Sequence, residues 1–377
     1  MLRPTLPQPM LPTRPPSMSS TLALTCFIVA AAGLSNAMAA LSAVDLPNAA
    51  SMSLPLLGLG VGGYYTAEGV YNDSQAERAV SLALAAGFRA VDTAVAYGNQ
   101  RGVGRALQQA KASGISVFTT TKVVGCGGIG VRTSACGADT EKQAQWALRE
   151  LQLRSVDLLL LHTPPNLPDA NLDSGTECQP SSQSCRLAQE QWAAMERLQQ
   201  AGAAKAIGVS NYGTACLACV LETSQVAPAV NQVQLHPGLG AAATNEAAKA
   251  ISELRAFASR HGIILQAYSP LTSLPATLNT IPEVTACAAR LGLSAPRVAI
   301  AWLVQLGVPV VTKSSSPSHL ADDIDAVEAP PRLDDACMAA ISAAAPPQGT
   351  RLPHYSAASA PFTTGGPEPL TSGSLDP

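Results

Sequence analysis

From about residue 54 onward, short and nearly continuous apolar runs alternate with longer amphipathic stretches. Such runs are typical of strands buried on both faces of a parallel sheet. Eight of them occur, at residues 54–62, 88–94, 115–122, 155–162, 204–211, 228–236, 262–270 and 307–314. The stretches between them predict helices, several ending at a glycine, at residues 74–87, 102–114, 139–153, 186–202, 244–262 and 296–307. This alternation predicts an α/β fold, a (β/α)8 TIM barrel, rather than an open sheet.

Polar residues stand at or just past the ends of successive predicted strands. Asp92 and Tyr97 follow the second strand, and Lys122 ends the third. His162 ends the fourth. Because the carboxyl ends of barrel strands face one shared mouth, we expect these side chains to meet there. Together they can transfer a proton, with the tyrosine as the acid and the other three setting its pKa and orienting the substrate.

The first forty residues differ from the rest of the chain. Residues 1–20 are Pro-rich, with Arg3 and Arg14 and no acidic residue, and an apolar run follows at 21–34. The small residues Ala37 and Ala39 then flank Met38, so we predict a cleavable secretory signal over residues 1–40 and a place in the ER lumen or outside the cell. A plastid transit segment is the alternative. The apolar run is too short to span a membrane stably, and we expect no membrane span in the mature chain.

Size and charge narrow the partners. Of the 377 residues, 47% are apolar, which is enough for one barrel domain, assigned here to residues 52–345. Residues 346–377 are rich in Pro, Gly and Ser and predict a flexible tail. The net charge of −3 and the absence of a basic stripe argue against a nucleic-acid partner. We expect a monomer that acts on a small molecule.

Eight cysteines remain once Cys26 leaves with the signal, and an even number suits disulfides formed in an oxidising compartment. Cys126 with Cys136, and Cys178 with Cys185, would each close a short loop. These two loops, 124–139 and 164–185, follow strand ends and should therefore border the mouth and shape access to it. Free thiols are the alternative, because sequence alone does not prove a pairing.

Two shorter motifs are weak indications of function. Cys216 and Cys219 form a CxxC pair, but no second ligand pair completes a zinc site and the segment reads as helical, so we assign it no function. Asn72, Asp73 and Ser74 form a glycosylation sequon that is usable only in a secreted chain. Asn72 is equally suited to cap the helix that follows.

Seven segments in the same order make the chain resemble the aldo-keto reductases over about residues 54 to 330. They are "GFRAVDTAVAYGNQRGVGRAL", "TTTKV", "VDLLLLHTPP", "AIGVSNY", "VNQVQLHP", "QAYSPL" and "VTKSS". The resemblance implies a barrel that reduces aldehydes or ketones to alcohols with NADPH and without a metal ion.

The resemblance also implies a role for each mouth residue. Tyr97 would protonate the carbonyl oxygen as hydride arrives from the nicotinamide. A free tyrosine has a pKa near 10, and the charge of Lys122 would lower it. Asp92 would pair with Lys122 and keep the buried ammonium charged. His162 would donate a hydrogen bond that orients the carbonyl.

The same resemblance implies a set of cofactor contacts. Ser210, Asn211 and Gln232 match residues that bind the nicotinamide carboxamide, and Tyr268 matches the aromatic residue stacked on the ring. Others match the pyrophosphate loop and the adenosine 2′-phosphate site, namely Ser269, Leu271, Ser273, Lys313 and Ser314.

This chain departs from the family pattern at two places. His319 replaces the usual Arg at the 2′-phosphate, and Asp322 and Asp323 replace a Glu-Asn pair. Histidine is mostly neutral at pH 7 and lacks the fork of Arg, so NADH is an alternative to the NADPH that Lys313 favours. At the substrate pocket, Gly62 and Thr163 stand where many relatives have Trp, and we assign no particular substrate.

Rival interpretations remain. Gly58, Gly60 and Gly63 fit a dinucleotide-binding fingerprint, but no helix opens at the glycines, so we interpret them as the first barrel strand. A barrel that binds a nicotinamide cofactor with little turnover, in a regulatory or redox-sensing role, is the main alternative function. An unrelated barrel chemistry such as a lyase would bind no nicotinamide at all.

Overall fold

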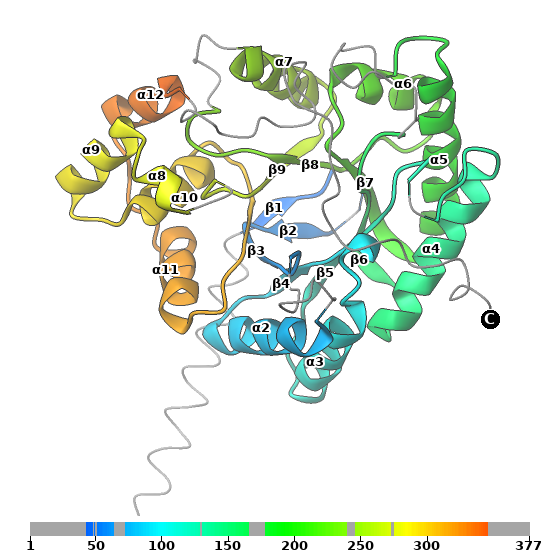
Figure 1. Cartoon of the computed structure of the whole chain (residues 1–377), viewed down its shortest axis with the longest axis horizontal. Helices are drawn as coiled ribbons and strands as arrows, with labels where there is room; N and C mark the ends of the chain where they lie inside the picture. The colour runs from blue at the N-terminus through cyan, green and yellow to red at the C-terminus, as the bar shows by residue number, and fades with distance from the viewer. Residues whose placement is uncertain are drawn as a thin grey trace, which may run out of the picture. The chain divides into compact units, whose positions relative to one another are not determined.

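A computed structural model describes residues 43–47, 49, 51–63, 72–128, 130–165, 178–239, 246–272 and 275–345. Eight parallel strands close into a barrel in the order β10-β3-β4-β5-β6-β7-β8-β9 (Figure 1). They are β3 (Leu57–Gly60), β4 (Ala90–Asp92), β5 (Phe118–Val123), β6 (Val156–Leu161), β7 (Ala204–Ser210), β8 (Val230–Gln234), β9 (Ile264–Tyr268) and β10 (Val310–Thr312). Each overlaps one of the eight predicted runs, so the predicted (β/α)8 barrel is confirmed.

Helices surround the strands. In chain order they are α2 (Asp73–Ala86), the 3-10 helix η1 (Val95–Tyr97), α3 (Gln100–Ala112), α4 (Cys136–Leu151), α5 (Gln183–Gln200), α6 (Thr214–Thr223), α7 (Glu246–Arg260), α8 (Pro275–Leu278), α9 (Pro282–Leu291), α10 (Ala295–Gln305), α11 (Pro317–Glu328) and α12 (Asp335–Ala343). Figure 1 shows them as a ring around the barrel strands. Within the described ranges, no single helix is long and apolar enough to cross a membrane, although α9 and α10 pass that test as a pair bent by 99°.

The side chains of β6 alternate between two cores. Leu159 and Leu161 belong to the large cluster shared with the surrounding helices. Leu158 and Leu160 belong to a second cluster inside the barrel. Both faces of the strand are therefore buried, which is why its sequence is an unbroken apolar run.

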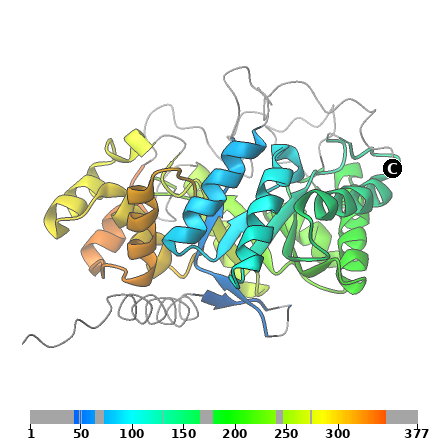
Figure 2. The same ribbon diagram turned by 90° about the horizontal axis from the view of Figure 1, so that it is seen from below.

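An antiparallel hairpin that the sequence analysis did not predict packs on this inner cluster. It is formed by β1 (Ala43–Asp45) and β2 (Ser53–Pro55). Leu46 and Leu54 are buried against the interior residues of the barrel. Figure 2 shows the hairpin at one end of the barrel. The predicted first strand, 54–62, thus contains the end of β2 and all of β3.

The eight cysteines of the described region form four disulfides. Cys126 pairs with Cys136, as predicted. The predicted closure of a short loop by Cys178 and Cys185 is wrong, because these two residues bond to the CxxC pair on α6 instead. The three remaining disulfides are Cys178–Cys216, Cys185–Cys219 and Cys287–Cys337. Two of them join α6 to the start of α5, at Cys185, and to Cys178 before that helix.

Asn72 is the N-cap of α2. Its side-chain oxygen accepts a hydrogen bond from the amide of Gln75 at 2.9 Å. The helix ends at Gly87, whose φ of 121° only glycine adopts without strain. The capping interpretation of this motif is therefore confirmed, and glycosylation of Asn72 stays a prediction.

Candidate active site

The four predicted mouth residues lie together at the carboxyl end of the barrel. Asp92 is the last residue of β4, and Tyr97 ends the 3-10 turn just beyond it. Lys122 lies on β5, and His162 directly follows β6, where its amide bonds the carbonyl of Val123 at 2.8 Å. The parallel register brings these strand ends to one edge, so the side chains meet as expected.

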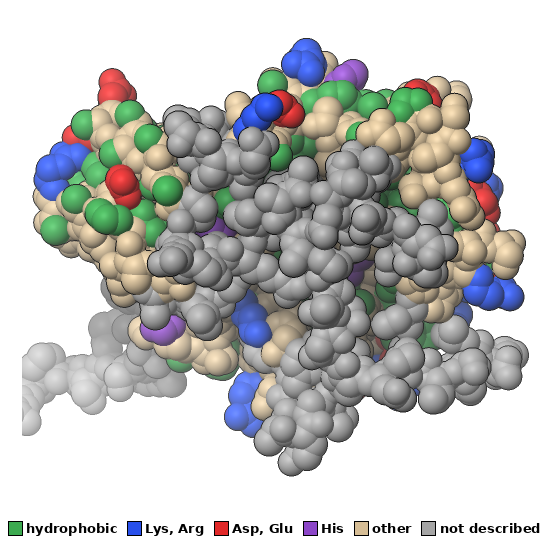
Figure 3. Space-filling view, turned by 45° about the horizontal axis from the view of Figure 1, so that its top comes forward, with side chains coloured by type: hydrophobic (Ala, Val, Ile, Leu, Met, Phe, Trp, Pro, Cys, Tyr) green, Lys and Arg blue, Asp and Glu red, His purple; other side chains and the backbone are tan. Residues whose placement is uncertain are grey.

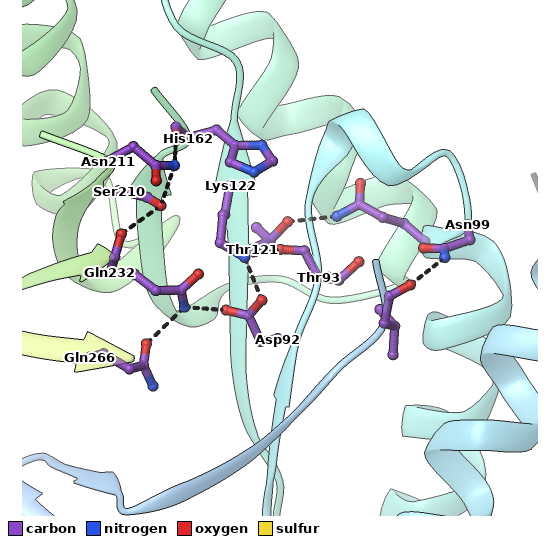
Figure 4. A network of polar contacts seen from close by, with 12 residues as sticks. Asp92, Thr93, Asn99, Thr121, Lys122, His162, Ser210, Asn211, Gln232 and Gln266 are labelled. Atoms are coloured by element: carbon purple, nitrogen blue, oxygen red, sulfur yellow. Dashed lines mark hydrogen bonds and ion pairs between the residues drawn. The ribbon is translucent and has the colours of Figure 1, made fainter. Parts of the chain in front are cut away.

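A buried ion pair forms the base of the site. The Lys122 ammonium contacts Asp92 Oδ1 and also donates to the carbonyl oxygen of Thr93 at 3.2 Å. Only 1% of Lys122 and 5% of Asp92 are exposed. The second carboxylate oxygen, Oδ2, accepts from Gln232 Nε2 at 2.7 Å (Figure 4). Both charges are thus compensated, as buried charges must be.

Tyr97 and His162 lie above this pair. The Lys122 ammonium is 5.3 Å from the Tyr97 ring centre and hydrogen-bonds its phenol oxygen. The rings of Tyr97 and His162 meet edge to face, with centres 5.5 Å apart. Both residues are only partly buried. The phenol and the imidazole therefore stand between the buried charges and the open side of the mouth.

The charges of the site follow from these contacts. Burial alone would lower the pKa of Lys122, but the Asp92 carboxylate and the Tyr97 phenol raise it above its ordinary value. The lysine is therefore an ammonium ion at neutral pH. Burial, together with the charge of Lys122, lowers the pKa of His162 to about 3. The imidazole is therefore neutral and has one N–H to donate.

Gly62 lies against the ring of Tyr97. A Cβ atom at this position would be 3.0 Å from Cζ of Tyr97, 3.2 Å from Cε1 and 3.3 Å from Cε2. The residue lies just past the end of β3. The missing side chain leaves room for the hydroxyl-bearing end of the tyrosine.

The residues expected to hold the nicotinamide join the same network. Asn211 Nδ2 donates to the carbonyl oxygen of His162 at 3.0 Å and to Ser210 Oγ at 3.1 Å. Tyr268 donates its hydroxyl hydrogen to Asn211 Oδ1 at 2.9 Å. Ser210 in turn donates to the carbonyl oxygen of Gln232 at 2.9 Å. Figure 4 shows Ser210, Asn211 and Gln232 close to the Asp92–Lys122 pair.

The other expected cofactor residues lie on the segments that follow β9 and β10. Ser269 has a left-handed φ of 49° just after β9, and Leu271 packs on the large core. Lys313 is exposed after β10 and donates to the carbonyl oxygen of Gly63 at 3.3 Å. Ser314 accepts from the amide of Ser316 at 3.1 Å. Ser273 lies outside the described residues, and the roles of all these residues stay predictions.

The start of α11 carries the unusual acidic residues. His319 and Asp322 are exposed, whereas only 4% of Asp323 is exposed. Burial raises the pKa of Asp323 to about 6, although nearby His319 favours its charged form. At neutral pH the carboxylate is still mostly ionised, so it adds to the negative charge of Asp322 on this helix.

The sequence analysis missed Gln266. Its side chain is 3% exposed on β9, and its Oε1 accepts from Gln232 Nε2 at 2.8 Å. The available signal was a glutamine within an otherwise apolar strand, directly before the "AYSP" segment. A polar residue that interrupts a buried strand needs a partner, and here the partner is Gln232.

The face shown in Figure 3 has basic and acidic side chains interspersed among the described residues. Among the described residues, that face has no large patch of basic or of acidic side chains alone. The view therefore gives no sign of a polyanion-binding surface there.

Comparison with known proteins identifies the class. A sequence model of the Aldo/keto reductase family matches residues 56–346. An aldo-keto reductase of Mycolicibacterium vanbaalenii is 35% identical over 274 residues, which cover 72% of this chain and 82% of that protein. A relative from Mycolicibacterium smegmatis, with the same description, is 34% identical over 277 residues and covers 72% and 81%.

Solved structures of similar fold belong to the same class of protein. The crystal structure of an aldo/keto reductase from Brucella melitensis has a TM-score of 0.61 and 30% identity, and the match covers 80% of this chain and 98% of that one. MGS-M4, an aldo-keto reductase from a deep-sea metagenome library, has a TM-score of 0.62 and 27% identity, with 80% and 93% covered. The chain belongs to the aldo/keto reductase family. It is therefore an oxidoreductase barrel that acts on small molecules.

Proposed function

We propose that this chain reduces an aldehyde or ketone to an alcohol with NADPH, and that Tyr97 is the proton donor. The observation that carries the proposal is the buried Lys122 ammonium, held by Asp92 and bonded to the Tyr97 phenol at the carboxyl end of the barrel. A phenol is a weak acid, and a fixed positive charge beside it stabilises the phenolate that proton donation leaves behind.

Each residue has one task in this mechanism. His162 is neutral and donates an N–H to the carbonyl oxygen, which orients it toward Tyr97. The Tyr97 hydroxyl gives its proton to that oxygen as negative charge develops there. Lys122 stabilises the resulting phenolate, and Asp92 prevents the lysine from losing its own proton in the buried site.

The residues present suit a nicotinamide cofactor. A carboxamide has both donors and an acceptor, and Ser210, Asn211 and Gln232 offer hydroxyl and amide groups at adjoining strand ends. The partly buried ring of Tyr268 offers a flat apolar face beside Asn211. When bound, the reduced cofactor would supply the hydride that adds to the carbonyl carbon.

The choice between NADPH and NADH depends on α11. The exposed ammonium of Lys313 favours a 2′-phosphate, whereas Asp322 and the buried Asp323 oppose one. We propose NADPH because the exposed Lys313 supplies a positive charge for the 2′-phosphate. Because Asp322 is exposed as well, we expect the preference over NADH to be modest. Replacing His319 with Arg should then raise the affinity for NADPH and leave that for NADH unchanged.

The test of the function is a turnover assay on the full chain. NADPH or NADH oxidation is followed with a panel of small aldehydes and ketones, and the alcohol product is quantified against cofactor consumed. One alcohol formed for each cofactor oxidised supports the proposal. Cofactor binding with no turnover on any carbonyl would favour the regulatory alternative, and no cofactor binding at all would reject both.

We also propose that the chain acquires its disulfides in the secretory pathway, because all eight cysteines of the described region are paired. Intact-mass and glycosidase analysis of native protein tests this. A mature start near residue 40 with a sugar on Asn72 supports the secretory route. An unmodified chain from plastids, with free thiols, would refute it.

A further inference from the structure

The amide of Gln232 is held from two sides. Its Nε2 donates one hydrogen to Asp92 Oδ2 at 2.7 Å and the other to Gln266 Oε1 at 2.8 Å. An ionised carboxylate and an amide oxygen only accept, so Nε2 must face both of them. Figure 4 shows this nitrogen between Asp92 and Gln266, with the amide oxygen of Gln232 turned away from both.

The contact with Gln266 matters because all three residues are buried. Their exposed fractions are 5% for Asp92, 2% for Gln232 and 3% for Gln266. If the oxygen of Gln266 were removed, one hydrogen of the buried Gln232 amide would lose its partner. A buried donor without a partner is unfavourable, so the Gln232 amide would shift toward another acceptor, and the geometry of its bond to Asp92 would worsen.

The weakening of that bond would reach Tyr97 through the ion pair. Asp92 Oδ2 would be less well compensated by Gln232, so more of the negative charge of the carboxylate would act on Lys122. The Lys122 ammonium would then be more fully neutralised, and it would stabilise the Tyr97 phenolate less. The titratable groups that face Tyr97 among the described residues are Lys122, Asp92 and His162.

We propose that Gln266 is a positioning residue, which acts through Gln232 to hold the Asp92–Lys122 pair in the arrangement that serves Tyr97. The inference rests on the proposed function, since the pair matters for catalysis only if Tyr97 is the proton donor. Gln266 itself touches no reacting atom. Its effect is carried across the barrel, because Gln232 lies on β8 and Asp92 on β4, which are not neighbouring strands.

The variant that tests the proposal is Gln266→Met, which keeps the length of the side chain and removes the acceptor. The matched control is Gln191→Met, since Gln191 is also fully buried but bonds Val124, Cys126 and Thr140 outside the site. The first readout needs neither cofactor nor turnover. It is the ultraviolet titration of tyrosinate in the full chain, from which the titration of Tyr97→Phe is subtracted to isolate Tyr97.

We expect Gln266→Met to move the Tyr97 transition to higher pH by about half a unit or more. It should also lower kcat more than it changes KM for the carbonyl. Gln191→Met should lose thermal stability and leave the Tyr97 transition where it is. A wild-type Tyr97 transition in Gln266→Met would overturn the proposal, because the residue would then be merely structural.

A second variant and the activity of the wild-type chain keep the test of Gln266 decisive. If Gln266→Met does not fold, Gln266→Asn is titrated instead, because its shorter side chain keeps an amide but draws the oxygen away from Gln232. The same upward shift supports the proposal and a wild-type transition overturns it. If the wild-type chain reduces no carbonyl, the proposed function fails, whereas an unshifted Tyr97 in an active enzyme rejects only the role of Gln266.

Discussion

Replacing Gly62 with alanine should impair turnover while leaving the fold intact. The new methyl group would lie 3.0 Å from Cζ of Tyr97 and 3.2 Å from Cε1. Non-bonded carbons are best placed at about 3.5–4.0 Å, so the ring must withdraw by about half an ångström. The nearest ring atom carries the hydroxyl, and therefore the displacement falls on the proton donor itself.

The size of the effect follows from that displacement. A misplacement of about 1 Å can reduce catalysis by about 10²-fold, so we expect a loss of about tenfold in kcat for half that distance. Gly62 has no positive φ, so alanine introduces no backbone strain there. Restricting the unfolded chain stabilises by about 0.4–1 kcal/mol. Overpacking costs about 1–3 kcal/mol, which leaves a net loss of at most about 2–3 kcal/mol.

The assay compares steady-state kinetics and urea unfolding for Gly62→Ala with those for Gly58→Ala. Gly58 lies on the same strand segment, but a Cβ there would meet only ordinary contacts at 3.6 Å and beyond. The control should therefore keep wild-type kcat. If Gly62→Ala also turns over at the wild-type rate, the packing of the tyrosine on this glycine has no part in placing the hydroxyl.

Three further predictions follow. Lys122→Met should lower kcat by about 10²–10⁴-fold with NADPH affinity retained, as steady-state kinetics would measure. It should also lower the free energy of unfolding in urea by about 3–5 kcal/mol, because Asp92 is left without its cation. Because the pKa of His162 is lowered to about 3 in the folded chain against about 6.5 unfolded, its neutral form contributes stability that is fully present above pH 6.5 and lost between pH 6.5 and 3. His162→Gln should lose less stability than wild type over that range in acid unfolding curves. Replacing Cys185 and Cys219 with serine opens a loop with a sequence separation of 34 and should lower the free energy of unfolding by about 3–4 kcal/mol, with no loss if that disulfide does not form in the protein.

The barrel and its mouth residues could be predicted because their signals are local. A strand buried on both faces is an unbroken apolar run, as the two leucine pairs of β6 illustrate. A polar residue at the end of such a run is conspicuous, which is how Asp92, Lys122 and His162 were found. The parallel register then brings those strand ends to one edge without any further information.

What the sequence did not disclose depends on contacts between distant segments. Cys178 bonds Cys216 across 38 residues, whereas the shorter loop to Cys185 looked equally suitable in the sequence. Gln266 meets Gln232 across 34 residues and has no motif of its own. The hairpin was missed because β2 and β3 adjoin, so that a single apolar run covers parts of two strands with different partners.

The most direct test of the account is the kcat of Tyr97→Phe, measured on the full chain together with the dissociation constant for NADPH. The account predicts that kcat falls by about 10²–10⁴-fold, because the phenylalanine has no proton to donate. NADPH affinity should stay within about twofold, since Asn211 is held by the carbonyl oxygen of His162 and by Ser210 Oγ, which the substitution leaves in place. A variant that reduces carbonyls at nearly the wild-type rate would contradict the assignment of Tyr97 as the acid.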